Sequence, residues 1–184
     1  MSDSSRAGSA VGRDVEQEVQ ASTLTSTFDD FFTAQYRSLL ALATALTGNR
    51  AIGEDVVQES LFAASRSWAK ISGYEDPAQW TRGVVIRRAS NVRRGRFREA
   101  RALRRLAGHR ETGEDLHEIV GDDFWQTVRQ LPRRQRECVT LRYLEDRSTA
   151  EIAATLNIAE PTVRVHLHAA RAALALALGE SEEP

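Results

Sequence analysis

The chain has 184 residues, 41% of them apolar, and a formal net charge of −1. This length suffices for one ordinary domain or two small ones with modest cores. No window holds the roughly eighteen consecutive apolar residues of a membrane span, and residues 1–26 lack the basic start and apolar run of a secretory signal. The single cysteine, Cys138, excludes an internal disulfide framework, so we expect a reducing, cytoplasmic location.

The first part of the chain predicts a tail and then three helices. Residues 1–27 are rich in Ser, Thr, Gly and Ala without an apolar period, which is typical of a disordered tail. A helix is expected from Phe28 until Gly48 stops it, and a second over residues 51–70. The third begins near Pro77 and continues to about Arg98. Together these helices predict a small domain over residues 28–98.

The second of these helices has two contrasting faces. Val57, Leu61, Ala64 and Trp68 recur at helical spacing and share the inward face. The opposite face mixes charged and polar side chains with an aromatic one: Asp55, Gln58, Glu59, Phe62 and Arg66. A solvent-facing surface has no need of Phe62. Either this ring packs on a neighbouring helix of a three-helix bundle, or it anchors a docking surface with a charged rim.

Charge is segregated along the chain. Residues 82–105 hold ten arginines and a single acid, Glu99, whereas acids gather at residues 54–59 and 111–123. A basic block of this kind is typical of a nucleic-acid binder; the alternative is a solvated helix in a chain that uses arginine rather than lysine. Residues 99–121 are expected to form a flexible linker, because the stretch from Gly108 is polar, acidic and aperiodic.

Residues 122–178 predict a second small helical domain, followed by a tail at residues 179–184. Ser148 and Glu151 have the spacing of a capping box, Asn157 tolerates the left-handed backbone of a tight turn, and Pro161 suits the first turn of the next helix. The positions expected to face the core are Ile152, Ala153, Leu156, Ile158, Val163, Leu167 and Ala170. Two short helices around such a turn make either a helix-turn-helix, whose second helix enters the major groove, or an ordinary helical hairpin. The candidates for DNA contact are Thr162, Arg164, Val165, His166 and His168.

No catalytic or metal centre stands out in the sequence. His166 and His168 are about 200° apart on a helix and cannot hold one metal ion together. Cys138 lies on a plausible apolar face, which favours a buried, inert thiol. Because there is also no Gly-rich phosphate loop, acid pair or Ser-His-Asp pattern, we expect no enzyme activity, no cofactor and no metal.

Two stretches resemble a known family. The segment GEDVVQESLF at residues 53–62, followed by Trp68, resembles the polymerase-binding helix of extracytoplasmic-function (ECF) sigma factors, a subgroup of the sigma-70 family of bacterial RNA polymerase sigma factors. The segment LPRRQRECVTLRY at residues 131–143, with EIA from Glu151 and TVR from Thr162, resembles their C-terminal domain. The resemblance covers about residues 28–178. It implies an all-α fold of two small helical domains, sigma domain 2 (a three-helix bundle) and sigma domain 4 (a helix-turn-helix), joined by a flexible linker.

The resemblance also implies partners and contacts. The first domain would dock on the clamp helices of the largest subunit of core RNA polymerase through Asp55, Gln58, Glu59 and Phe62. It would meet the −10 promoter element as the strands separate, through Gly73, Tyr74, Trp80, Arg87, Arg88, Asn91 and Arg94. The second domain would bind duplex DNA at the −35 element through Pro161, Thr162, Arg164, Val165, His166, His168 and Arg171. An anti-sigma factor is a further implied partner, and no membrane insertion is implied.

The chain departs from the family pattern at four positions. Arg87 stands where asparagine is usual and Asn91 where aspartate is frequent, which predicts a different choice of −10 bases. Ala169 replaces a common arginine and His166 a common arginine or lysine, which predicts altered or weaker −35 contacts. The docking helix carries none of these changes.

The function expected from these observations is that of an alternative sigma factor, which recognises both promoter elements on polymerase and directs transcription initiation. Two weak DNA-binding domains gain effective concentration for each other when polymerase fixes their separation, so the free chain is expected to bind promoters poorly. A stand-alone helix-turn-helix regulator is the main alternative, although no heptad seam for a dimer is evident. An RNA-associated adaptor that uses only the arginine block is a second alternative.

Overall fold

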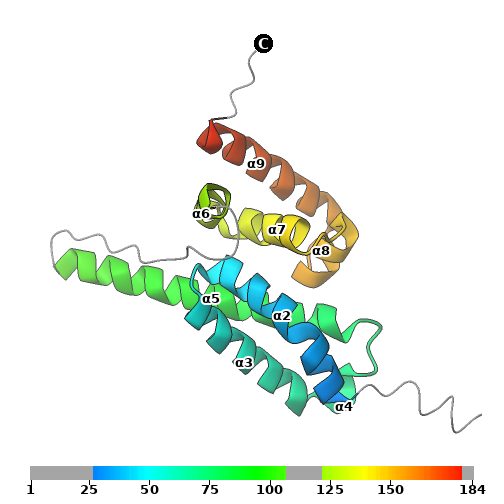
Figure 1. The fold of residues 1–184 in the computed structure, drawn as a ribbon. Coiled ribbons are helices and arrows are strands. Elements are labelled where there is room, and N and C mark those ends of the chain that lie inside the picture. The colour runs from blue at the N-terminus through cyan, green and yellow to red at the C-terminus, as the bar shows by residue number, and fades with distance from the viewer. Residues whose placement is uncertain (1–26, 107–121, 180–184) are drawn as a thin grey trace, which may run out of the picture.

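The computed structural model describes residues 27–106 and 122–179 (Figure 1), which are helical with short connections and contain no strand. Helices α2–α5 form an N-terminal unit, and helices α6–α9 form a C-terminal unit that lies above it in Figure 1. The predicted all-α fold is therefore confirmed. The flexible linker was predicted over residues 99–121, but residues 99–106 continue helix α5 (Pro77–Leu106). The rest of that linker (107–121), residues 1–26 of the predicted tail at 1–27, and residues 180–184 lie outside the described residues.

Helix α2 (Phe28–Thr47) begins and ends at clear local signals. The Thr27 hydroxyl accepts from the backbone N–H of Asp30 while the Asp30 carboxylate accepts from the backbone N–H of Thr27, a complete capping box. At the other end Gly48 has a φ of 78°, and its N–H donates to the carbonyl of Thr44 at 2.8 Å. Glycine adopts this left-handed backbone without the steric cost of a Cβ atom, so the predicted stop at Gly48 is confirmed.

The predicted continuous helix over residues 51–70 is interrupted at Ser67. Helix α3 (Arg50–Arg66) ends there, and the short helix α4 (Trp68–Ile71) follows. The break turns the indole of Trp68 onto α2, where its ring centroid lies 5.5 Å from that of Phe28 and 4.9 Å from that of Phe31. Aromatic contacts of this kind stabilise by about 0.5–1.5 kcal/mol beyond their buried area, and they hold Trp68 against α2 after the break.

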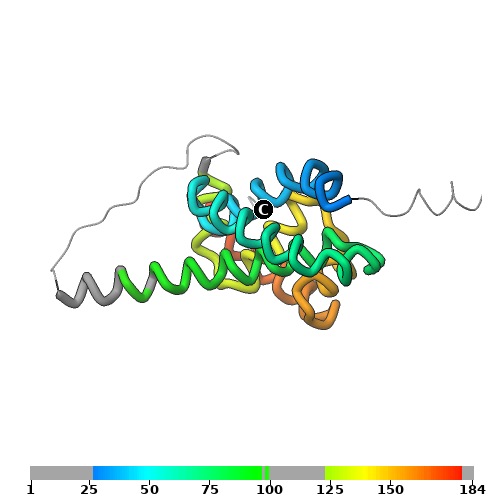
Figure 2. Tube along the Cα trace, turned by 90° about the horizontal axis from the view of Figure 1, so that it is seen from below, coloured from blue at the N-terminus to red at the C-terminus, as the bar shows by residue number. Residues whose placement is uncertain are grey.

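Helix α5 (Pro77–Leu106) starts at the predicted proline and runs past the predicted end near Arg98. The Asp76 carboxylate caps its first turn by accepting from the backbone N–H of Gln79 at 2.9 Å. Its later turns consist mainly of Arg, Ala and Leu, which are strong helix formers, with no proline to stop them. Figure 2 shows α5 extending beyond the other helices.

The C-terminal unit comprises α6 (Asp122–Gln130), α7 (Arg133–Leu144), α8 (Thr149–Leu156) and α9 (Glu160–Leu178). Of the seven positions predicted to face its core, all are buried except Ile158, which is half-buried against the core. Helices α8 and α9 pack on each other and on α7, so the predicted helix-turn-helix arrangement is present.

The two units are in contact in this structure. Helix α2 packs against α6 and α7, and α5 packs against α8. We call this contact region the interunit interface. The buried apolar residues of both units belong to one continuous cluster. Helix α3 packs on α2 and α5 at the side of the N-terminal unit away from α7 (Figure 1).

Candidate nucleic-acid interface

The outer face of α3, formed by Asp55, Gln58, Glu59 and Phe62, is exposed in all four residues. The side chain of Phe62 is 63% exposed, so the alternative in which it packs inside a three-helix bundle is wrong. The guanidinium of Arg66 lies 6.0 Å from the centroid of the Phe62 ring. An aromatic ring exposed among polar and charged groups offers a partner an apolar anchor with a polar rim.

The inner face of α3 fixes the orientation of this outer face. Val57, Leu61 and Ala64 are buried as predicted. Gly53 allows the close approach of α2, because a Cβ atom there would lie 2.7 Å from the Thr44 hydroxyl oxygen and 3.0 Å from the Thr44 backbone nitrogen. Sequence reasoning missed this role, although a glycine inside an apolar helical pattern is the signal that indicates a close packing contact.

The outer face of α3 is connected to α5 by an ion pair between Glu59 and Arg88. Glu59 was predicted to contact polymerase and Arg88 to contact the −10 element. Their side chains are 66% and 37% exposed, and ion pairs at such exposure contribute only about 0–1 kcal/mol. The pair therefore orients Arg88 without preventing it from exchanging partners.

The arginine block on α5 divides into two groups. Arg82 and Arg93 face the C-terminal unit, where Arg82 pairs with Glu145 and Arg93 donates to the carbonyl of Arg129. Arg87, Asn91 and Arg94, three of the residues predicted to contact the −10 element, are exposed. The sequence alone did not separate these groups, because alternation of buried and exposed positions on one helix is set by what packs against it.

The remaining residues predicted to contact the −10 element lie in the first turns of α5 and in the loop that precedes it. Gly73 and Tyr74 are exposed in the loop between α4 and α5, and Tyr74 is 38% exposed. Trp80, in the first turns of α5, is half-buried. The cap made by Asp76 fixes the loop to the helix. An exposed tyrosine ring suits stacking on an unpaired base.

The helix-turn-helix is fixed by local hydrogen bonds. The Ser148 hydroxyl accepts from the backbone N–H of Glu151 at 3.2 Å, and the Glu151 carboxylate accepts from the backbone N–H of Ser148 at 2.9 Å. The bond from the Ser148 backbone N–H to the carboxylate, with further bonds from the side chains of Arg147 and Ser148, lowers the pKa of Glu151 to about 2. Asn157 occupies the left-handed region at φ 50° and ψ 55°, as predicted for the turn. The Thr149 hydroxyl donates to Glu160 at 2.8 Å and so ties the start of α8 to the start of α9.

Helix α9 presents the residues predicted to contact the −35 element. Pro161, Thr162, Arg164, Val165, His168 and Arg171 are exposed, and His166 is half-buried. Val165 is 65% exposed, which leaves an apolar side chain free to meet a thymine methyl group. Arg164 pairs with Glu160 at 2.6 Å on the same helix. This exposed pair is weak and can give way to a base or phosphate.

Arg171 lies farther along α9 and is held by α7. Its guanidinium donates to the hydroxyl of Tyr143 at 3.1 Å. Tyr143 is 50% exposed, so Arg171 and Tyr143 together make a polar extension of the α9 surface. This position suits a phosphate contact at the edge of a DNA site rather than a base contact.

Sequence reasoning missed two buried carboxylates: Glu137 on α7 and Glu145, the residue that follows the last residue of α7. Both bond to residues of the N-terminal unit: Ser90 donates to Glu137 at 2.7 Å, and Ser38 donates to Glu145 at 2.8 Å. Cys138 between them is fully buried, as predicted, and burial raises the pKa of its thiol to about 11. The sequence carries no clear signal of this burial, because Glu137 follows four polar residues of α7 and Glu145 lies in the polar turn after it.

Most of the predicted contact residues are exposed, in three sets: on α3, on α5 with the loop before it, and on α9. The Glu59–Arg88 pair joins the first two sets. Among residues 27–106 and 122–179 there is no group of acids, histidines and cysteine placed to hold a metal ion. No helix in the part of the chain that the structure describes is both long and apolar enough to cross a membrane.

Comparison with known proteins agrees with this geometry. Residues 122–174 match the family model of sigma-70 region 4. The chain is 33% identical over 147 residues to the ECF RNA polymerase sigma factor SigL of Mycobacterium tuberculosis, covering 75% of this chain and 81% of SigL. It is 30% identical over 138 residues to the ECF RNA polymerase sigma-E factor of Salmonella typhimurium, covering 65% of this chain and 70% of that protein.

Two solved structures share the fold. The sigma factor RpoE of Bartonella quintana, solved in complex with the anti-sigma factor NepR, superimposes with a TM-score of 0.68 at 21% identity, covering 84% of this chain and 98% of RpoE. CnrH in complex with the cytosolic domain of CnrY superimposes with a TM-score of 0.60 at 20% identity, covering 84% of this chain and 89% of CnrH. With SigL aligned over both helical units, the alternative of a stand-alone regulator is not favoured. The chain belongs to the ECF family of RNA polymerase sigma factors.

Proposed function

We propose that this sigma factor binds core RNA polymerase through the outer face of α3, contacts the −10 element with α5 and the α4–α5 loop, and contacts the −35 element with α9. The observation that carries the proposal is the 63% exposure of Phe62, which shares the outer face of α3 with the carboxylates of Asp55 and Glu59. An exposed ring with charged neighbours offers a partner an apolar anchor inside a polar rim. The clamp helices of the largest polymerase subunit are the partner that we propose.

Promoter recognition is divided between the two units. Residues 28–98 act as sigma domain 2 and residues 122–178 as sigma domain 4. Arg87 and Asn91 contact bases or phosphates of the separating strands, while Arg164 and Val165 contact base edges in the major groove. Each surface is small, so strong promoter binding requires polymerase to hold both units at the spacing of the two elements.

The proposal extends to partners and location. NepR and CnrY are bound to the related sigma factors in the two solved complexes, and we propose that this chain is also regulated by an anti-sigma protein. Its site of action is the cytoplasm, where core polymerase and promoter DNA are. The chain acts by binding and positioning, and the chemistry of RNA synthesis belongs to core polymerase.

Co-elution with core RNA polymerase tests the proposal. The full chain and its Glu59→Ala/Phe62→Ala variant are mixed with the cognate core and separated by size. The matched control is Asp29→Ala/Phe32→Ala, which removes an exposed acid and a 41%-exposed aromatic from α2. We expect the wild type and the control to co-elute in equal molar amounts and the α3 variant to elute alone. A folded wild-type chain that does not bind its cognate core would contradict the proposal and favour a stand-alone regulator.

A further inference from the structure

A pocket of about 330 Å³ lies between the two helical units, with walls from α5, the start of α7, the end of α8 and the turn after α8. Three arginines line it: Arg87 of α5, and Arg133 and Arg134 of α7. Among the described parts of the chain no acidic residue lines it, and its apolar side chains are only Ile86 and Leu156, which are nearly fully buried. The lining therefore suits a negatively charged ligand rather than an apolar one.

The positive charge of this pocket is only partly neutralised. Arg133 and Arg134 both pair with the fully buried Glu137, at 2.7 and 3.0 Å. Their own side chains are 41% and 40% exposed, so both guanidiniums remain accessible to a ligand. Arg87 is exposed and has no hydrogen bond or ion pair with another described residue. Three cations at the pocket thus share a single carboxylate.

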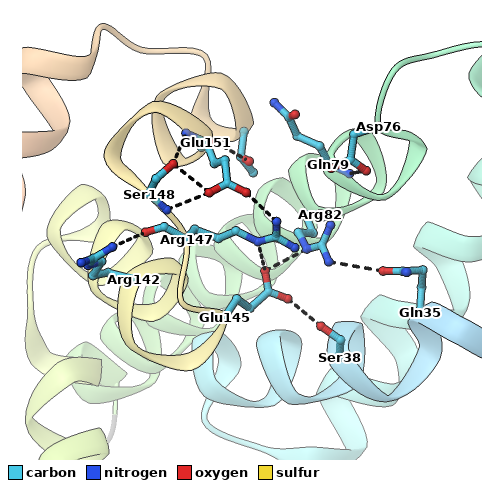
Figure 3. A network of polar contacts seen from close by, with 11 residues as sticks. Gln35, Ser38, Asp76, Gln79, Arg82, Arg142, Glu145, Arg147, Ser148 and Glu151 are labelled. Atoms are coloured by element: carbon cyan, nitrogen blue, oxygen red, sulfur yellow. Dashed lines mark hydrogen bonds and ion pairs between the residues drawn. The ribbon is translucent and has the colours of Figure 1, made fainter.

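A neighbouring polar network at the interunit interface is balanced, as Figure 3 shows. Arg82 pairs with Glu145 at 2.9 Å and donates to Gln35 at 3.3 Å. Arg147 pairs with Glu151 at 2.7 Å and lies 4.0 Å from Glu145. The two arginines of this network therefore neutralise its two carboxylates. The pocket differs, because its cations outnumber the acid that they pair with.

The start of α7 adds to the positive potential. Arg133 and Arg134 lie in its first turn, which contains no acidic residue, and Pro132 at the N-cap provides no side-chain acceptor for the first N–H groups. A helix N-terminus carries partial positive charge and favours anions over cations. In the same helix, burial and then repulsion from Arg93 lower the pKa of Arg136 to about 10. An anion bound in the pocket would offset this accumulated positive charge.

The donors and the volume of the pocket favour a ligand larger than a single phosphate. Guanidinium groups bind phosphate oxygens through paired N–H donors, and three such groups line this pocket. A diphosphate group presents more terminal oxygens and more negative charge than a single phosphate, so it can engage all three. The volume of about 330 Å³ is within the range of small-molecule sites and leaves room for a nucleoside. Asn157, which is exposed and also lines the pocket, offers an amide donor and acceptor to a sugar or base.

We propose that this pocket binds a small anion that carries a diphosphate group, either inorganic pyrophosphate or a nucleoside diphosphate, through Arg87, Arg133 and Arg134. The ligand contacts both helical units at once, because α5 supplies the first arginine and α7 the other two. Arg87 is also one of the residues proposed to contact the −10 element, so ligand and promoter would share this guanidinium. The binding site itself does not depend on that proposed function.

Calorimetric titration of the full-length chain with sodium pyrophosphate, at constant ionic strength and without divalent cations, tests the site. Arg87→Gln removes the unpaired cation of the pocket. Its matched control is Arg94→Gln, which removes the same charge from an exposed position about two turns along α5 that does not line the pocket. We expect saturable binding by the wild type and an affinity within about twofold of it for Arg94→Gln, because salt screens distant charges. Arg87→Gln should bind at least about tenfold more weakly, because a hydrogen bond between charged groups is lost.

A second variant and two further ligands sharpen the test. Arg134→Gln changes the pocket from α7 instead of α5 and should also weaken pyrophosphate binding about tenfold, while circular dichroism checks that each variant keeps its helices. Titration with ADP distinguishes the two sources of the diphosphate group. Tighter binding of ADP than of pyrophosphate would identify a nucleoside diphosphate as the ligand, and equal or weaker binding would identify pyrophosphate. Sulfate, which has fewer oxygens and less charge, should bind more weakly than either.

Three results would overturn the proposal: no saturable binding of pyrophosphate by the folded wild-type chain, equal affinity for sulfate, or an equal loss of affinity in Arg87→Gln and Arg94→Gln. The last would indicate a diffuse basic surface instead of a site. Co-elution with core polymerase is measured separately, in buffer without pyrophosphate. A chain that binds core but not pyrophosphate would lose this site and keep the proposed function, whereas a chain that binds pyrophosphate but not core would do the reverse.

Discussion

The close contact between Gly53 and Thr44 allows the packing of α2 on α3 to be tested with one substitution, Gly53→Ala, which adds a single methyl group. In Gly53→Ala the new Cβ atom would lie 2.7 Å from the Thr44 hydroxyl oxygen, 3.0 Å from its backbone nitrogen and 3.2 Å from its Cα atom. Two of these neighbours are backbone atoms, so a rotation of the Thr44 side chain cannot relieve the overlap. The two helices must move apart.

The magnitude follows from two opposing effects. Alanine in a helix interior is more stable than glycine by about 0.5–1 kcal/mol, while overpacking a close contact costs about 1–3 kcal/mol. Gly95→Ala on α5 gains the helix stability of alanine without the cost of overpacking, because nothing lies within 4 Å of its Cβ position. We therefore expect the free energy of unfolding of Gly53→Ala to be about 1–3 kcal/mol below that of Gly95→Ala.

Urea unfolding followed by circular dichroism measures this difference, with both variants made in the full chain. Adding Thr44→Ala to Gly53→Ala removes the contact with the hydroxyl oxygen and should recover part of the loss, since the backbone contacts remain. Equal stability of Gly53→Ala and Gly95→Ala would refute the reasoning that a close approach of α2 requires this glycine.

Five further outcomes are expected. Ser148→Ala removes the cap of α8 and should lower the free energy of unfolding by about 1 kcal/mol in thermal or urea melts. The Glu151 pKa is lowered from 4.5 to about 2 by bonds from Ser148 and Arg147. The stability that these bonds contribute is therefore present above pH 4.5 and is lost as the pH falls toward 2. In Glu151→Gln the free energy of unfolding, measured between about pH 5 and 2, should lack this loss. Asn157→Ala should destabilise the chain by about 1 kcal/mol in the same melts because its φ is 50°, whereas Asn157→Gly should cost less. Arg164→Ala should weaken promoter binding by the polymerase complex by about 1–3 kcal/mol and relax the choice of one −35 base, as filter binding with single-base variants of the site would show. Cys138 should react with a thiol reagent only after unfolding, because it is fully buried and its pKa is raised to about 11; fast labelling of the native chain would contradict its burial.

Local signals explain why most helix positions were predictable. Gly48, Pro77, Ser148 and Asn157 act within a few residues of where they stand, and the structure has a helix end, a helix start, a cap and a turn at these four positions. The spacing of apolar residues likewise predicted the buried positions of α3, α8 and α9, because a helix buries a fixed stripe of its surface.

Contacts between distant parts of the chain explain what was missed. The break at Ser67 depends on the packing of Trp68 against Phe28 and Phe31, which the local sequence does not reveal. Arg82 and Glu145 are 63 residues apart in the chain, and each has many possible partners of opposite charge in a sequence with 25 basic and 26 acidic residues. The exposure of Phe62 was left open by the sequence for the same reason, since only the full packing of the bundle decides it.

The ion pair between Glu59 and Arg88 changes how substitutions on the outer face of α3 must be interpreted. Glu59→Ala removes a group proposed to touch polymerase, and at the same time it releases a guanidinium on the helix proposed to touch DNA. A change in transcription by this variant therefore combines two effects of different origin, which can oppose each other. A double-mutant cycle with Arg88→Ala separates them, because the coupling energy isolates the part that passes through the pair. A substitution at either residue therefore also changes the surroundings of the other, so the proposed polymerase contact and the proposed DNA contact cannot be altered separately by a single change at this pair.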